Sequence, residues 1–222
     1  TDNEVALFTR NAPECRVRVQ AMGNGVDTDY FSVDDTRSSP FPPGELPVVF
    51  TGAMDYLPNV DAATWFASDV LPGLLQRWPA VRFYVVGRNP SAAVLALASD
   101  RIVVTGTVDD VRPYLQHAAT VVAPLRIARG IQNKILEAMA MGRPVIASAT
   151  CAAAVDAVAG QELLTATSPE EYIAAISQVL EAPETATAMG GAARQRVVER
   201  YTWEAHMKAI DPYLPAPSLR ET

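Results

Sequence analysis

The sequence PLRIARGIQNKILEAMAMGRPVIAS, residues 124–148, follows one short apolar run and ends in a second. Gly130 precedes a segment from Ile131 to Met141 whose apolar residues recur at helical spacing. Gly142 and Pro144 end that segment, as glycine and proline commonly end helices. A strand, a glycine-bearing loop, a helix and another strand in this order are typical of a crossover between parallel strands.

The same alternation of short apolar runs and helical patterns continues along the chain. The predicted strands are residues 47–51, 81–86, 102–105, 120–123 and 144–147, with a sixth candidate at 163–165. The predicted helices are 59–77, 109–117 with Asp109 as cap, 131–141, 169–180 with a capping box at Ser168 and Glu171, 184–200 and 203–213. Because the strand runs lack polar alternation, both faces of the sheet should be covered. We therefore predict an α/β fold, a Rossmann-like parallel sheet flanked by helices.

Residues 34–47, DDTRSSPFPPGELP, are rich in proline, serine and glycine and are interpreted as a linker or exposed loop. We expect residues 1–44 to be the end of a preceding domain with this linker, 45–200 the Rossmann-like domain, and 201–222 a terminal helix and tail. Because the chain starts with Thr1, inside a helical pattern, we expect it to be a piece of a longer protein.

Composition excludes several classes of protein. The 222 residues carry 18 basic against 25 acidic side chains, a formal net charge of −7, which argues against a nucleic-acid partner. Cys15 and Cys151 show no metal-ligand spacing. No segment approaches the about 20 apolar residues that span a bilayer, and no signal pattern is present, so a cytoplasmic location is expected.

Common motifs of other enzyme classes are absent. The sequence has no GxGxxG loop after a strand, no GxxxxGK[ST] loop and no GxSxG elbow. The histidines, His117 and His206, do not suggest a metal site or a catalytic triad. Asp27-Thr28-Asp29 has the spacing of a cation site, but it follows Asn24-Gly25 and is interpreted as a turn. No metal and no cofactor are expected.

The segment around Gly130 carries the features of an anion site. Glycine lets backbone approach a ligand closely, and the first N–H groups of a helix attract negative charge. The candidate donors are the N–H groups of Ile131, Gln132 and Asn133, with positive charge from Arg126, Arg129 and Lys134. Glu137 lies one turn further on the face of Asn133 and Lys134, where a carboxylate can accept ribose hydroxyls. From spacing alone, an exposed Lys134–Glu137 pair with solvated Arg126 and Arg129 is equally acceptable.

The string GIQNKILEAMAMGRPVIAS at residues 130–148 resembles the signature of group 1 glycosyltransferases, family 4 of the retaining architecture with two Rossmann domains, called GT-B. Further pieces follow in the family's order: NGVD at 24–27, VVFTGAMDYLPN at 48–59, FYVVGRNP at 83–90 and IVVTGTVDDVRPYL at 102–115. The resemblance covers residues 15–213. The PNV…WF pattern at residues 58–66 and the string RGIQNK at 129–134 are most similar to sugar transferases of exopolysaccharide and exosortase systems.

The resemblance implies a C-terminal domain that binds a nucleotide sugar, with Glu137 as the ribose ligand. Two departures from the family pattern stand out. Arg129 occupies the position of the first glutamate of the E-x7-E motif, and no basic pair follows Gly52. We therefore expect Arg129 and Lys134, with Arg88 or Arg126, to balance the charge of the diphosphate. Arg129 and Lys134 are also the expected catalytic residues. Gly52, Pro58 and Asn59 lie at a strand end that leads into a helix and are candidates to border it.

The implied activity is hexosyl transfer from a nucleoside diphosphate sugar with retention of configuration, in exopolysaccharide or cell-surface glycan synthesis. The acceptor domain would be the missing N-terminal half, and any peripheral membrane association would come through that half. Residues 1–222 alone are expected to bind the donor without turnover. Two alternatives remain: a sugar-nucleotide epimerase-like enzyme, and a nucleotide-binding or interaction module that has lost activity.

Overall fold

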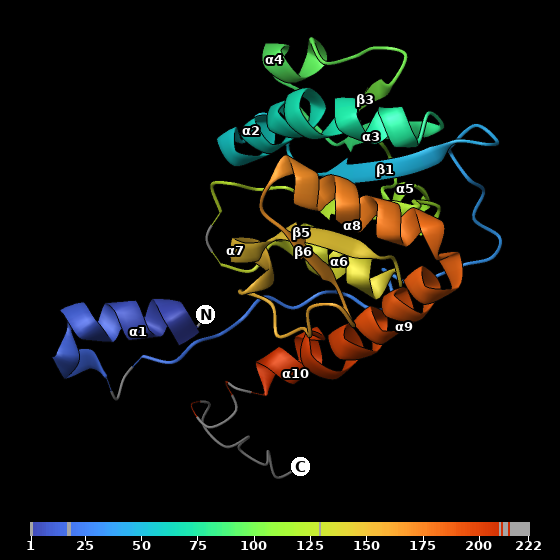
Figure 1. The fold of residues 1–222 in the computed structure, drawn as a ribbon. Coiled ribbons are helices and arrows are strands. Elements are labelled where there is room, and N and C mark those ends of the chain that lie inside the picture. Colours follow the sequence, from blue (N-terminus) through green and yellow to red (C-terminus); the bar gives the residue numbers. More distant parts are fainter. Residues whose placement is uncertain (1, 17–18, 129, 209, 211–212, 214–222) are drawn as a thin grey trace.

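The computed structural model describes residues 2–16, 19–128, 130–208, 210 and 213, and its centre is a parallel β-sheet (Figure 1). Within these residues the sheet has six strands in the order β3-β2-β1-β4-β5-β6, and each neighbouring pair is parallel. The strands are β1 (Leu46–Thr51), β2 (Val81–Val86), β3 (Ile102–Gly106), β4 (Thr120–Ala123), β5 (Val145–Ser148) and β6 (Leu164–Ala166). The predicted fold class is confirmed, and the predicted strands agree with these to within one residue at each end.

Helices cover both faces of the sheet. They are α1 (Asp2–Asn11), α2 (Leu57–Trp65), α3 (Leu71–Arg77), α4 (Ala92–Leu95), α5 (Arg112–Gln116), α6 (Asn133–Ala140), α7 (Ala149–Ala152), α8 (Pro169–Glu181), α9 (Pro183–Arg200) and α10 (Trp203–Met207), with a 3-10 turn η1 (Pro13–Cys15) and a π-helical turn η2 (Phe66–Val70). Helices α3 and α8 pack on each other on one face, and α6 packs against α9 on the other (Figure 1). Strand residues Val48, Val49 and Phe50 are fully buried between these layers, as the uninterrupted apolar runs predict.

Several predicted helices have different boundaries in the structure, among them the one predicted for residues 203–213, where helix α10 ends at Met207. The helix predicted for residues 59–77 is divided by the π-helical turn η2, whose last residue, Val70, directly precedes Leu71 and Pro72. Proline has no N–H and its ring collides with the carbonyl four residues earlier, so the regular bonding pattern is interrupted there. The helix predicted from Asp109 starts at Arg112, because the carboxylate that accepts its first N–H, at 2.9 Å, belongs to Asp110.

The helix that follows β6 begins as predicted. Ser168 accepts a hydrogen bond from the N–H of Glu171, and the Glu171 carboxylate accepts one from the N–H of Ser168, which completes the capping box. Helix α6 ends at Gly142, whose positive φ of 64° is easily reached by glycine. The start of α8 and the end of α6 are therefore both determined by local sequence.

The segment before the sheet packs along the C-terminal helices. Val26 donates its N–H to the carbonyl of Tyr201 at 2.7 Å, and Arg194 of α9 donates to the carbonyl of Phe31 at 2.9 Å. Asp27 accepts hydrogen bonds from the N–H groups of Asp29 and Tyr30, so the predicted turn at this D-x-D sequence is confirmed. The division into residues 1–44, 45–200 and 201–222 stays a proposal.

Other expectations from composition concern metals and membranes. In the part of the chain that the structure describes, no three histidine, cysteine, aspartate or glutamate side chains gather as a metal site would require. None of the helices in that part is long and apolar enough to cross a bilayer. Cys15 and Cys151 are both free thiols.

Candidate functional site

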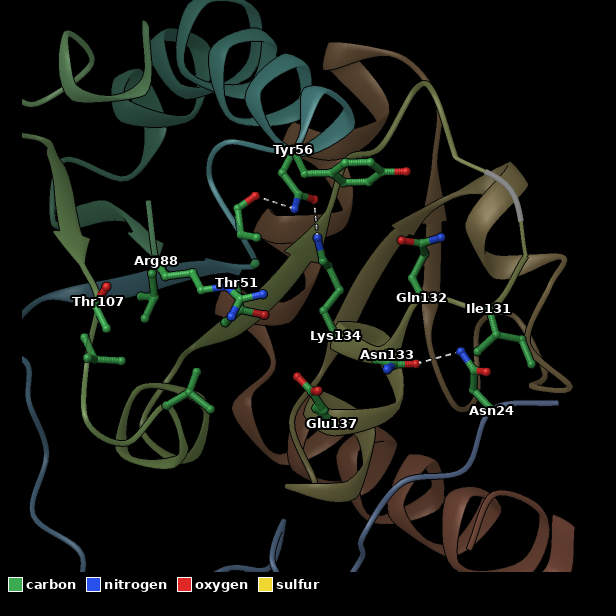
Figure 2. Close-up of a pocket in the computed structure, with 17 residues that line it drawn as sticks. Asn24, Thr51, Tyr56, Arg88, Thr107, Ile131, Gln132, Asn133, Lys134 and Glu137 are labelled. Atoms are coloured by element: carbon green, nitrogen blue, oxygen red, sulfur yellow. Dashed lines mark hydrogen bonds between the residues drawn. The ribbon is translucent and has the colours of Figure 1, made fainter. Parts of the chain in front are cut away.

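A cleft of about 560 Å³ lies at the carboxyl ends of the central strands. The strand order reverses direction between β1 and β4, which is where open parallel sheets bind their ligands. The lining comes from the ends of β1, β2 and β3, from the start of α6 and from the N-terminal segment (Figure 2). Its residues are Asn24, Thr51, Gly52, Ala53, Tyr56, Asn59, Val86, Gly87, Arg88, Thr107, Val108, Val111, Ile131, Gln132, Asn133, Lys134 and Glu137.

Two glycines bring the ends of β1 and β2 together at the floor of this cleft. A Cβ on Gly87 would lie 1.7 Å from the carbonyl oxygen of Gly52, a distance that no side chain can occupy. A Cβ on Gly52 would lie 2.7 Å from Asn59 Nδ2 and 3.0 Å from Lys134 Nζ. Both glycines therefore leave room for backbone and for the Lys134 ammonium group.

Lys134 is a buried cation at this floor. Its side chain is 9% exposed, its ammonium donates a hydrogen bond to Asn59 Oδ1, and its Nζ lies 4.5 Å from the centre of the Phe50 ring. Asn59 is held in turn by a 2.9 Å hydrogen bond from its Nδ2 to the carbonyl of Ala53. Burial lowers the pKa of Lys134 to about 8. An exposed Lys134–Glu137 pair, the alternative that spacing alone allowed, is therefore wrong.

Glu137 and Asn133 project from the same helix into the cleft (Figure 2). Burial raises the pKa of Glu137, and the charge of Lys134 acts in the opposite direction. Asn133 Oδ1 accepts a 2.9 Å hydrogen bond from Asn24 Nδ2, so the segment before the sheet closes one wall. The shared face predicted for Asn133, Lys134 and Glu137 is confirmed.

The start of α6 differs from the prediction. Gly130 has a left-handed φ of 68°, Gln132 is extended with φ −99° and ψ 114°, and the helix begins at Asn133. The predicted start at Ile131 is therefore wrong by two residues. The first-turn N–H groups belong to Asn133, Lys134 and Ile135, while Ile131 and Gln132 reach the cleft from the loop.

The predicted arginines do not all reach the cleft. Arg88 is exposed and lines it from the end of β2 (Figure 2). Arg126 binds the Asp61 carboxylate through two nitrogens and lies over the Trp65 ring, 5.5 Å from its centre. It borders an adjoining hollow of about 450 Å³, which shares Tyr56 and Gln132 with the cleft. Arg129 lies outside the described residues.

Several lining residues were not singled out from the sequence. Thr51 is 4% exposed, and its hydroxyl has no hydrogen-bond partner among the described residues although it borders the cleft. Thr107, Val108 and Val111 line the far end, beyond β3. Their position just after predicted strands was a usable signal, because ligands bind beyond strand carboxyl ends. Asn24 and Tyr56 gave no such signal.

The fold and this cleft define a Rossmann-like α/β domain with its ligand site at the switch point. The family model described as glycosyl transferases group 1 matches residues 45–182. The chain therefore belongs to the group 1 glycosyltransferase family. No curated protein shows a significant match to it.

Solved glycosyltransferase structures share the fold. HepE from Anabaena, solved in complex with UDP, is 16% identical with a TM-score of 0.75, over 89% of this chain and 57% of that one. Sucrose-phosphate synthase from Thermosynechococcus elongatus is 22% identical with a TM-score of 0.71, over 91% and 55%. WaaG, a glycosyltransferase involved in lipopolysaccharide biosynthesis, is 16% identical with a TM-score of 0.64, over 89% and 56%. The chain spans a little over half the length of each of these structures.

Proposed function

We propose that this chain is the donor domain of a retaining glycosyltransferase, which binds a nucleoside diphosphate sugar and transfers a hexose in exopolysaccharide or other cell-surface glycan synthesis. The observation that carries the proposal is the buried ammonium of Lys134, held by Asn59 at the floor of an open cleft. Among the described residues no carboxylate forms an ion pair with Lys134, although the charge of Glu137 favours its protonated form. Such a buried cation is costly unless a ligand supplies the opposite charge. The family and the position of the cleft make a diphosphate the natural ligand.

The proposed diphosphate position lies between Lys134 and the start of α6. Lys134 supplies a point charge, the first-turn N–H groups of α6 supply oriented dipoles, and Arg88 lies at the rim. Negative charge on the diphosphate grows as the glycosidic bond breaks. Groups fixed before the reaction therefore stabilise the transition state more than the ground state.

The nucleoside is proposed to extend from there toward β3. Glu137 lies one turn along α6 and can accept both ribose hydroxyls. Beyond it, Val108 and Val111 offer apolar contact for a flat base, and Thr107 a hydroxyl. Because HepE was solved with UDP and with UDP-glucose, uridine nucleotides are the first to test.

Retention is proposed to come from the leaving group. The acceptor hydroxyl attacks the sugar on the same face from which the phosphate departs, and the departing phosphate accepts its proton, so that no protein nucleophile is needed. The acceptor site belongs in this proposal to a further, N-terminal domain, and the cytoplasm is the proposed location. Arg129, in the position of the family's first glutamate, joins Lys134 as a proposed catalytic cation.

That same arginine favours one other candidate, a nucleotide-binding module without transferase activity. The test is an assay of the full-length protein against a panel of nucleotide sugars with a mixed glycan acceptor. Transfer with the donor's anomeric configuration, read by NMR coupling constants, is the expected result. Nucleotide binding without any transfer would favour the module, and epimerised free sugar nucleotide would favour an epimerase.

A further inference from the structure

A second cavity lies at the opposite end of the sheet from the donor cleft. It has a volume of about 240 Å³, and its lining residues include those at the end of α8, the start of α9 and the start of β1. Leu46 begins β1 and Pro144 directly precedes β5, whereas the donor cleft begins at Thr51, where β1 ends. Thr51 lies five residues after Leu46 along β1, roughly 17 Å at the usual rise per residue.

The cavity wall is apolar except for one cation. Among the described residues that line the cavity, Arg143 is the one that carries a charge. The others are Leu46, Ala118, Ala119, Gly142, Pro144, Val179, Leu180, Pro183, Ala186 and Thr187. The Thr187 hydroxyl donates to the carbonyl of Pro183 at 2.8 Å, so it is already used. A guanidinium in apolar surroundings is the kind of group that needs a counter-ion.

None of the described residues forms an ion pair with Arg143 that would supply that counter-ion. Arg143 Nε is buried and has no hydrogen-bond partner among the described residues. The nearby carboxylates are engaged elsewhere, Glu45 by Arg82 and Tyr84, and Glu181 by Arg77. Burial alone lowers the pKa of Arg143, with no opposing charge to raise it. Most buried polar groups are paired, so an unpaired one in a cavity points to a ligand.

The turn that carries Arg143 is held in place by helix α9. A Cβ on Gly190 of α9 would lie 2.0 Å from the carbonyl oxygen of Gly142, so α9 packs directly on the turn that carries Arg143. Arg194 of α9 also donates to the carbonyl of Ala140 at the end of α6. Arg143 therefore cannot reach another partner by a small shift of its turn.

We propose that this cavity binds a small monocarboxylate with a short apolar chain, its carboxylate on the Arg143 guanidinium and its chain against Leu46 and Val179. One cation balances one negative charge, and a guanidinium binds a carboxylate through parallel hydrogen bonds. A phosphate dianion fits less well, because the first residue of α9, Pro183, offers no N–H. The site is separate from the donor cleft and does not depend on its function.

The test follows the Nε–H resonance of Arg143 by NMR while hexanoate is titrated into residues 1–222. The resonance is assigned from its loss in Arg143→Met. We expect a saturable shift with hexanoate, and affinities at least about tenfold weaker for hexan-1-ol and inorganic phosphate. Equal binding of the alcohol or of phosphate would overturn the proposal, as would the absence of a saturable shift.

Two variants make the result specific. Ala186→Leu fills the cavity and keeps Arg143, so hexanoate binding should be lost while nucleotide binding remains. Arg200→Met removes one exposed arginine charge outside the cavity and should leave hexanoate binding unchanged. Hexanoate binding that survives Ala186→Leu, or that is lost equally in Arg200→Met, would contradict this site.

Discussion

The ammonium of Lys134 on α6 donates a hydrogen bond to the side-chain oxygen of Asn59 on α2, across the end of β1. This contact joins helices on opposite faces of the sheet at the carboxyl ends of the strands, where both helices can reach a ligand. A neutral amide satisfies the donor without cancelling its charge, so the positive charge stays available to an anion. This pair is the centre of the proposed donor site.

The buried hydroxyl of Thr51 is expected to bind the ligand. Thr51→Val keeps the shape and removes the hydroxyl, which has no hydrogen-bond partner among the described residues. Binding of a nucleoside diphosphate should weaken about tenfold, while the free energy of unfolding of the free protein should stay the same or rise. Calorimetric titration and urea unfolding measure the two effects.

The control for Thr51 is Thr165→Val, on an exposed position of β6. It should leave nucleotide affinity unchanged. If Thr51→Val binds as tightly as the original protein, the hydroxyl does not contact the ligand.

Glu137 is expected to recognise the ribose and not the diphosphate. Glu137→Gln should weaken UDP binding by roughly tenfold, because a carboxylate accepts hydroxyl hydrogen bonds better than an amide. Pyrophosphate binding should stay the same or strengthen, because a negative charge close to Lys134 is removed. Competition titrations measure the affinity for UDP and the affinity for pyrophosphate separately.

Glu199→Gln, a change on exposed α9 surface, serves as the matched control and should alter neither affinity. Equal losses of UDP and pyrophosphate affinity in Glu137→Gln would place Glu137 near the phosphates and refute the ribose assignment.

The close approach of Gly87 and Gly52 should be essential for stability. Gly87→Ala places a Cβ against the Gly52 carbonyl and should lower the free energy of unfolding by about 3 kcal/mol. Gly191→Ala, in the middle of α9 with no atom near the new Cβ, should raise it by up to about 1 kcal/mol. Urea unfolding midpoints compare them, and an unchanged midpoint for Gly87→Ala would show that the strand ends are further apart.

The pKa of about 8 for Lys134 gives a defined pH dependence. Nucleotide affinity should fall as pH rises from 7 to beyond 8, because the ammonium loses its proton. An unfolded lysine titrates near ~10.4, so between these values the folded chain holds fewer protons than the unfolded chain. The contribution of Lys134 to stability is therefore least favourable below pH 8 and improves as pH rises through this window. Titrations and unfolding from pH 7 to 10, with Lys134→Met as the comparison, measure both trends.

The strands could be predicted because each is a continuous apolar run between turn residues, a purely local signal. The α6 boundary could not, because Gly130 and Gln132 adopt loop conformations that their neighbours determine. The role of Arg126 was also hidden, since its partner Asp61 is 65 residues away. Spacing along the sequence was enough to predict that Lys134 and Glu137 share a site. Only the fold shows that Lys134 donates a hydrogen bond to Asn59.

The most direct test of the donor site is calorimetric titration of residues 1–222 with UDP, GDP and ADP, in the original chain and in Lys134→Met. At least one nucleotide should bind saturably, and Lys134→Met should lower that affinity by about 30-fold, the loss of a hydrogen bond to a charged group. Lys208→Met, which removes an exposed lysine just after α10, should have no effect. Absence of binding by all three nucleotides, or equal affinity in Lys134→Met, would contradict the account.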